Sequence, residues 1–107
     1  MCDSNFKNIN GEDAYKLINR DKEVVILDVR SKEEYDNGHI PGAKLFPVQG
    51  LSMRIDELDE YIDKPILVYC ASGARSPRAV DTLIENDFSN IYHLNRGISS
   101  WRHDLAK

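Results

Sequence analysis

Long apolar runs are missing from this 107-residue sequence. No stretch approaches the roughly 20 apolar residues of a membrane-spanning helix, and the N-terminal segment lacks the apolar region of a secretory signal. An excess of positive charge is missing as well. Because the formal net charge is −4, we expect no general affinity for nucleic acid or for an anionic membrane surface. We therefore expect a cytoplasmic protein whose partners include neither nucleic acid nor membrane.

Cysteine and histidine are also scarce. The cysteines are Cys2 and Cys70, and the histidines are His39, His93 and His103. Since no Cys-x-x-Cys or His-x-x-x-His spacing occurs, the sequence predicts no metal site, and we expect no cofactor. A lasting disulfide is disfavoured, because Cys2 lies in a polar start of the chain and a cytosolic setting keeps thiols reduced.

What the sequence does contain is an alternation of short apolar runs with amphipathic stretches. With 41% apolar and 30% charged residues, the chain can bury one core, and we expect a single domain over residues 1–107 with a core of about 6–105. Continuous apolar runs of this length are typical of strands that are covered on both faces. The predicted strands are Val24–Leu27 and Ile66–Tyr69, with weaker candidates at Ala43–Phe46, Ile91–Leu94 and Phe6–Ile9.

Helix signals lie between these runs, and they combine capping residues with apolar stripes. Helices are predicted to begin at Asn10, at Ser31 with Glu34 in a capping box, at Ser52, near Ser76 with Pro77 in the first turn, and at Ser99 with Trp101 and Leu105 on the inner face. Strands that alternate with helices of these lengths predict an α/β fold with a parallel sheet. Its active site is then expected beyond the carboxyl ends of the strands.

A loop with distinctive chemistry lies at that edge, between the strand Ile66–Tyr69 and the clearest predicted helix. It begins at Cys70 and continues with Ala71, Ser72, Gly73, Ala74, Arg75 and Ser76. The small residues allow the backbone to curl, so that several N–H groups can point inward as an anion-binding nest. The following helix directs the positive end of its dipole at the same place, and Arg75 adds a planar cation suited to oxyanions.

These features predict that Cys70 is a reactive thiolate at neutral pH. A free cysteine has a pKa near about 8.5, and a helix N-terminus or a neighbouring cation lowers it. The alternative for a lone cysteine after an apolar strand is a small buried hydrophobic residue. No histidine lies near Cys70 in sequence and no Cys-His-Asn pattern is evident, so the predicted reactivity does not require a partner base.

Three motifs, in order along the chain, resemble the signatures of the rhodanese family. They are Leu27–Arg30 followed by Gly38–Ala43, the loop Cys70–Ser76, and the segment Leu94–Trp101. The resemblance implies a three-layer rhodanese-like α/β fold, in which a five-stranded parallel sheet is flanked by helices on both faces. It also implies an enzyme of the thiosulfate sulfurtransferase type. Cys70 would take a sulfane sulfur from a small donor such as thiosulfate, hold it as a persulfide, and pass it to cyanide or a thiol acceptor.

The resemblance suggests roles for residues around Cys70. Residues 71–76 would bind the donor, with Arg75 steadying both the loop and the anion. We expect Asp28 to support the neighbouring loop by accepting backbone N–H bonds rather than to act in catalysis. For Arg30 we consider the mouth of the pocket and a solvent-facing ion pair with Glu33 or Glu34, and we favour the ion pair.

Two residues depart from the family pattern. Ala71 stands where family loops often carry a basic residue, which leaves one cation fewer to bind thiosulfate. Arg96 replaces the first of two glycines in the closing signature. Either the backbone takes a different path there, or Arg96 directs a new positive charge toward the pocket.

Other functions are weighed against sulfur transfer. The family's sulfurtransferases have six residues from the cysteine to the arginine, as Cys70 to Arg75 does, whereas related phosphatases and arsenate reductases have one more. Loop length therefore favours sulfur transfer over phosphate hydrolysis. A persulfide carrier, or a module that docks on a sulfur-accepting partner protein, would have the same sequence features.

Overall fold

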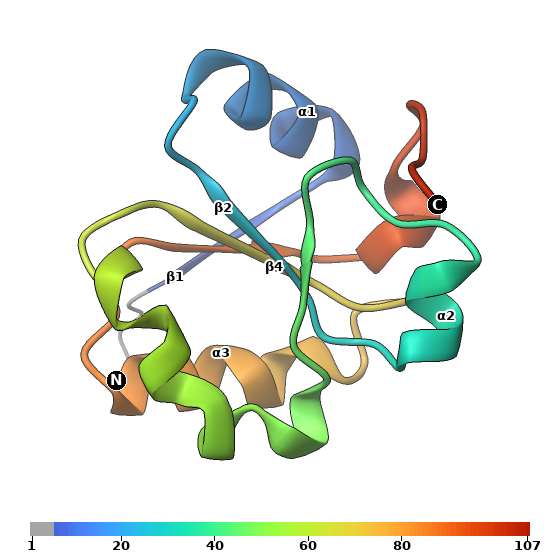
Figure 1. Cartoon of the computed structure of the whole chain (residues 1–107). Helices are drawn as coiled ribbons and strands as arrows, with labels where there is room; N and C mark the ends of the chain where they lie inside the picture. The colour runs from blue at the N-terminus through green and yellow to red at the C-terminus, as the bar shows by residue number, and fades with distance from the viewer. Residues whose placement is uncertain (1–5) are drawn as a thin grey trace.

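The central layer is a sheet of five parallel strands in the computed structural model, which describes residues 6–107 (Figure 1). The strands are β1 (Phe6–Ile9), β2 (Val25–Asp28), β3 (Lys44–Leu45), β4 (Ile66–Tyr69) and β5 (Ile91–Leu94), in the order β1-β5-β4-β2-β3. The predicted parallel sheet is confirmed. However, β2 begins and ends one residue later than predicted, and β3 is shorter than the predicted Ala43–Phe46.

The two central strands are apolar because both of their faces are covered. Every residue of β2 and β4 is buried. Their register pairs Asp28 with Tyr69, so the two strands end side by side. Val29 and Cys70 therefore start neighbouring loops at the carboxyl edge of the sheet.

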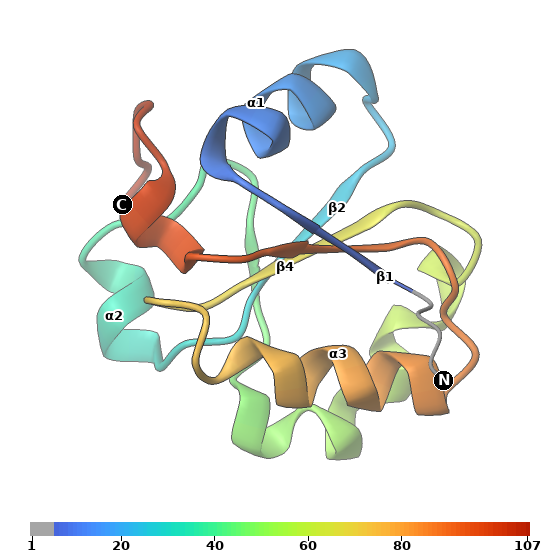
Figure 2. The same cartoon turned by 180° about the vertical axis from the view of Figure 1, so that it is seen from behind.

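Helices cover both faces of the sheet, and Figure 2 shows the arrangement from behind. The α-helices are α1 (Gly11–Arg20), α2 (Lys32–Asp36) and α3 (Ser76–Glu85), and the 3₁₀ helices are η1 (Val48–Gly50), η2 (Ser52–Tyr61) and η3 (Gly97–Ser100). On one face, α3 and η2 contribute Val80, Leu83 and Leu58 to a buried cluster. On the other face, α1 contributes Ala14 to a second cluster. The predicted three-layer architecture is confirmed.

The predicted caps of the first two helices are present. The Asn10 side chain accepts a hydrogen bond of 2.8 Å from the Asp13 N–H at the start of α1. Ser31 and Glu34 form the predicted capping box at the start of α2. These local signals therefore set where both helices begin.

The helix predicted to be capped by Ser52 differs from expectation. The segment is the 3₁₀ helix η2, and Ser52 is its first residue rather than its cap, since the backbone of Leu51 is already helical. The physical reason is the spacing of its apolar residues. Ile55, Leu58 and Tyr61 recur every three residues, which places them on one face of a 3₁₀ helix, and all three belong to the same core.

The predicted final helix from Ser99 through Leu105 is wrong. After the short η3, Trp101 has an extended backbone and is half-buried, while the Leu105 side chain is exposed. The chain is instead held by backbone hydrogen bonds of 2.9 and 2.8 Å between His39 and Ala106. Pairing with the His39 segment therefore replaces helical hydrogen bonding here.

None of the helices within residues 6–107 is long and apolar enough to cross a membrane.

Candidate active site

The Cys70 loop connects the end of β4 to the start of α3 and rests on the segment that follows β5. The N–H groups of Ile98 and Ser99 donate to the carbonyl oxygens of Cys70 and Ala71, at 2.9 and 3.3 Å. Gly97 has a φ of 64°, and a Cβ there would overlap both carbonyl groups. The backbone of the segment after β5 therefore packs directly against the cysteine. Only glycine permits this close approach at position 97.

The thiol sulfur of Cys70 lies inside the curled loop. The N–H groups of Gly73 and Arg75 point at Sγ from 3.1 and 3.4 Å, and the Ser76 hydroxyl lies 3.3 Å away. The cysteine is 0% exposed. The predicted inward-pointing N–H groups are thus present. Cys2, the other cysteine, lies outside the described residues.

The pKa of the Cys70 thiol is lowered by its surroundings. Burial alone would raise this pKa, because it penalises the thiolate. Hydrogen bonds from the Ser76 hydroxyl and from the backbone N–H groups of Arg75, Ser76 and Gly73 outweigh that penalty. The start of α3 adds its dipole at the same point. The loop therefore stabilises negative charge on sulfur mainly through neutral donors.

Behind the cysteine, two further side chains continue the hydrogen bonding inward. The Ser76 Oγ lies 2.5 Å from Nε2 of His93, and Nδ1 of His93 lies 2.8 Å from Oδ1 of Asn8. His93 and Asn8 were not predicted as site residues, because neither lies near Cys70 along the chain. One signal was available: His93 is a polar residue inside a predicted apolar strand, at the sheet edge where Cys70 lies.

Asp28 supports the site through a buried polar network. Its carboxylate accepts hydrogen bonds from the Arg30 N–H at 3.0 Å, from the Arg30 guanidinium at 2.7 to 3.1 Å, and from the Tyr69 hydroxyl at 2.7 Å. Tyr69 in turn accepts from the Ile40 N–H, and Arg30 donates to the Gly38 carbonyl. The network joins the ends of β2 and β4 to the loops that contain Arg30 and Gly38–Ile40, and it includes the backbone N–H bond that was expected of Asp28.

The predicted surface ion pair of Arg30 is wrong. Its guanidinium is buried against Asp28 instead of reaching Glu33 or Glu34 in solvent. The reason is that Asp28, buried at the end of β2, accepts hydrogen bonds from both the backbone N–H and the guanidinium of Arg30 and so holds this side chain in the interior. Burial acts to lower the pKa of Arg30, but its hydrogen bonds and ion pair with Asp28 leave that pKa above its ordinary value. Arg30 is therefore a permanent cation within the network.

Arg75 makes a contact that the sequence did not reveal. Its guanidinium donates two hydrogen bonds of 2.9 Å to the Glu34 carboxylate on α2. Arg75 hydrogen bonds, followed by those from Ser31, lower the pKa of Glu34 to about 2. The pair fixes the Cys70 loop to α2, as expected for a residue that steadies the loop. Its charge, however, is balanced by Glu34, so less of it acts on the sulfur.

Arg96 lies exposed next to η3 with a φ of −107°. This conformation suits any residue, so the backbone accepts a side chain at this first glycine position without a left-handed turn. The second glycine, Gly97, is the one whose conformation and packing require glycine.

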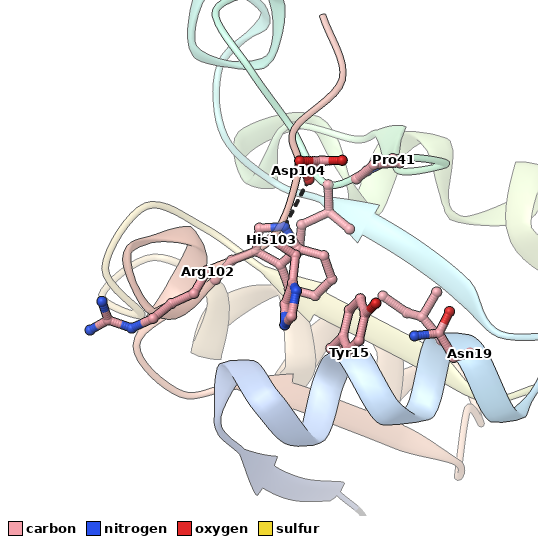
Figure 3. Close-up of a pocket in the computed structure, with 9 residues that line it drawn as sticks. Tyr15, Asn19, Pro41, Arg102, His103 and Asp104 are labelled. Carbon is pink, nitrogen blue, oxygen red and sulfur yellow. Dashed lines mark hydrogen bonds between the residues drawn. The ribbon is translucent and has the colours of Figure 1, made fainter.

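Two pockets lie near the carboxyl edge of the sheet. A cleft of about 260 Å³ adjoins the Cys70 loop, and its lining includes Arg75, Arg30, Lys32 and Val48. A larger pocket of about 470 Å³ lies between α1 and the C-terminal segment (Figure 3).

In the larger pocket, Tyr15 stacks on His103 with ring centroids 3.5 Å apart, and Trp101 lines the wall. Its lining does not include Cys70. The lining of the smaller cleft does not include Cys70 either, but it includes Arg75 of the Cys70 loop, so this cleft is the better candidate for substrate entry. Within residues 6–107, no group of three or more His, Cys, Asp or Glu side chains is placed to hold a metal ion.

Comparison with known proteins gives consistent matches. Residues 10–104 match the model of the rhodanese-like domain family. Thiosulfate sulfurtransferase GlpE of Coxiella burnetii is 31% identical over 97 residues, which cover 91% of this chain and 88% of that protein. The uncharacterized protein YqhL of Bacillus subtilis is 40% identical over 76 residues, which cover 71% of this chain and 59% of that protein.

Solved structures show the same fold. A rhodanese-related protein from Thermoplasma volcanium has a TM-score of 0.82 and 32% identity, with 94% of this chain and 97% of that chain covered. A protein of unknown function from Rhodopseudomonas palustris, described as a possible tyrosine phosphatase, has a TM-score of 0.80 and 28% identity, with 91% and 80% covered.

Proposed function

The chain belongs to the rhodanese-like domain family, and we propose that it is a sulfurtransferase that carries a sulfane sulfur on Cys70. The observation that carries this proposal is the convergence of the Gly73 and Arg75 N–H groups and the Ser76 hydroxyl on Sγ. These donors lower the pKa of the thiol and are suited to hold a persulfide anion in the same place.

The proposed reaction has two displacements. The Cys70 thiolate attacks the outer sulfur of thiosulfate, the S–S bond of the donor breaks with its electron pair, and sulfite leaves. The enzyme then holds a persulfide anion. A thiol or cyanide attacks the outer persulfide sulfur, and the Cys70 thiolate is regenerated. In this scheme residues 71–76 bind the donor and Arg75 holds the loop through Glu34.

The partners in this proposal are a small sulfur donor and a thiol acceptor, which can be a sulfur-accepting protein. The family match over residues 10–104 supports the proposal that residues 1–107 act as one domain with a core of about 6–105. The cytoplasmic location stays a prediction.

A direct test is thiosulfate:cyanide turnover, combined with mass spectrometry of the protein after thiosulfate treatment. We expect the wild-type protein to gain one sulfur atom on Cys70 and to form thiocyanate, whereas the Cys70→Ser variant does neither. A Cys2→Ser variant is the matched control and retains both properties. Absence of the added sulfur from the wild type would overturn the proposed intermediate.

The persulfide carrier is the second candidate, because the same donors around Sγ would hold a persulfide in a protein that does not turn over with small acceptors. A carrier would gain the sulfur but form no thiocyanate. The phosphatase alternative is tested with an aryl phosphate. Hydrolysis that is lost in Cys70→Ser would replace sulfur transfer by phosphate chemistry.

A further inference from the structure

We propose that Ser76 and His93 form a proton relay for Cys70, in which His93 takes the thiol proton through Ser76 and Asn8 orients the His93 ring. The proposal rests on the proposed role of Cys70 as a nucleophile, and it adds a base that the proposed function does not include.

The relay is a continuous row of close polar contacts. It runs from Cys70 Sγ to Ser76 Oγ over 3.3 Å, from Ser76 Oγ to His93 Nε2 over 2.5 Å, and from His93 Nδ1 to Asn8 Oδ1 over 2.8 Å. It crosses from the active-site loop through the first residue of α3 to β5 and then β1. Each successive pair of polar atoms is therefore close enough to share a hydrogen.

The same atomic positions suit both protonation states of the cysteine. With a neutral thiol, Sγ–H donates to Ser76 Oγ and the Ser76 hydroxyl donates to Nε2. With a thiolate, the Ser76 hydroxyl donates to Sγ and the protonated Nε2 donates to Ser76 Oγ. Conversion breaks the S–H bond and forms an Nε2–H bond, while Ser76 exchanges its hydrogen. No electron is gained or lost.

Asn8 sets which imidazole nitrogen takes part. Its Oδ1 is an acceptor, so it requires a hydrogen on Nδ1 of His93 in both states. Nε2 is then the nitrogen that accepts and returns the proton. Because an amide carries no charge, Asn8 orients the ring without stabilising the charged imidazolium as a carboxylate would.

Burial explains why such a relay is useful. Cys70 and Ser76 are 0% exposed and His93 is 3% exposed, so the thiol proton has no direct path to solvent. A protein base within the buried site supplies an acceptor for that proton. For thiosulfate, the sum of the first displacement is a thiol plus a thiosulfate dianion giving a persulfide anion plus bisulfite. The proton held on His93 returns through Ser76 and leaves on the sulfite.

The surroundings of His93 favour a reversible proton transfer. Asn8 and Phe6 face it from β1, Ser76 from α3 and Val68 from β4, all of them uncharged. Burial is the cause that lowers the pKa of His93. Within the described part of the chain, Cys70 is thus the titratable group to which His93 is connected, through the Ser76 hydroxyl. Imidazolium is stabilised here when the thiolate forms, so the two groups titrate together.

The test measures the rate of Cys70 alkylation by iodoacetamide against pH, in a Cys2→Ser background so that one thiol reacts. We expect His93→Gln to slow alkylation at pH 7 by at least about tenfold and to recover toward the wild-type rate at high pH, because one unit in the thiol pKa changes the thiolate fraction about tenfold. His103→Gln, which changes a histidine of the other pocket, is the matched control and should leave the profile unchanged.

Asn8→Asp separates a relay from a merely structural role. A carboxylate beside Nδ1 stabilises the imidazolium, so this variant should move the onset of alkylation to lower pH, opposite to His93→Gln. A role in packing alone predicts that both variants fail in the same direction, and that result would overturn the relay. So would a His93→Gln profile equal to the wild type.

Nuclear magnetic resonance of the His93 ring nitrogens gives a second readout. Methylthiolation of Cys70 removes the titrating thiol, and the Nε2 resonance of His93 should then lose its coupled titration step. An unchanged titration would contradict the proposal. Neither measurement uses a sulfur donor, so the relay can fail while persulfide formation succeeds, and the reverse.

Discussion

The residues around Cys70 are of two kinds. Neutral donors contact the sulfur, and charged side chains form ion pairs with one another. Gly73, Arg75 and Ser76 supply the donors. The guanidinium of Arg75 pairs with Glu34, and Arg30 pairs with Asp28. Ala71 occupies the position next to the cysteine, where family loops often carry a basic residue. The proposed binding of an anion therefore depends on these neutral donors more than on the two guanidinium groups, since each of those is paired with a carboxylate.

Adding that cation should strengthen thiosulfate binding. We expect Ala71→Lys to lower the KM for thiosulfate about fivefold at low ionic strength, because an exposed charge near a dianion contributes about 1 kcal/mol. Ala71→Gln is the control, with a long polar side chain and no charge. Steady-state kinetics at two salt concentrations check the result, since screening should shrink the Lys effect. A KM that falls equally in both variants would contradict a charge effect.

The Asp28 network should dominate the stability of the carboxyl edge. Asp28→Ala removes the partner of a buried guanidinium and of the Tyr69 hydroxyl, so we expect the free energy of unfolding to fall by about 3–5 kcal/mol. Urea unfolding measures this change. The control is Asp36→Ala, which breaks the exposed ion pair with Lys32 and should cost less than about 1 kcal/mol. Similar losses in both variants would show that the buried network adds little.

At the scale of elements, the site depends on how the segment after β5 supports the Cys70 loop. Gly97→Ala should reduce the free energy of unfolding by about 2 kcal/mol or more, because alanine meets both a left-handed backbone and the carbonyl groups of Cys70 and Ala71. The alkylation rate of Cys70 should change as well.

The control for Gly97→Ala is Gly50→Ala, since an added Cβ at Gly50 has no neighbour within 4 Å. It should be close to neutral in urea unfolding. If Gly97→Ala were equally mild, η3 would not be the element that shapes the loop.

Elements were predictable where the signal is local. The buried strand Ile66–Tyr69, the Asn10 cap and the Ser31 capping box depend on neighbouring residues, and each is present as expected. Contacts between distant segments were not predictable. His93 lies 17 residues from Ser76 and 85 from Asn8, and Glu34 lies 41 from Arg75. Only the strand order brings these groups together.

The helix predicted to begin at Ser99 was wrong for a related reason. Its apolar residues suggested a helix, but its backbone pairs with His39, which is far away in the sequence. The candidate loop itself was recognisable because Cys70–Ser76 is contiguous. The row of contacts behind it was not recognisable, because Ser76, His93 and Asn8 come from three different elements.

At the scale of the whole molecule, the Glu34–Arg75 pair links α2 to the Cys70 loop and should couple stability to pH. The pKa of Glu34 is about 2 when folded, against an ordinary value of 4.5, because Arg75 hydrogen-bonds its carboxylate. The unfolded chain therefore binds a proton at Glu34 more readily. This contribution to stability is complete above about pH 4.5 and is lost as the pH falls toward 2.

Glu34→Gln should therefore flatten the fall in stability between pH 4.5 and 2. The expected difference at neutral pH is about 1 kcal/mol, since the Glu34 and Arg75 side chains are 35% and 42% exposed and solvent screens the pair. Urea unfolding at a series of pH values measures it, with Glu33→Gln on the same helix as control. A slope that Glu34→Gln leaves unchanged would mean that other carboxylates cause the acid sensitivity, and that α2 and the Cys70 loop are joined by packing rather than by this ion pair.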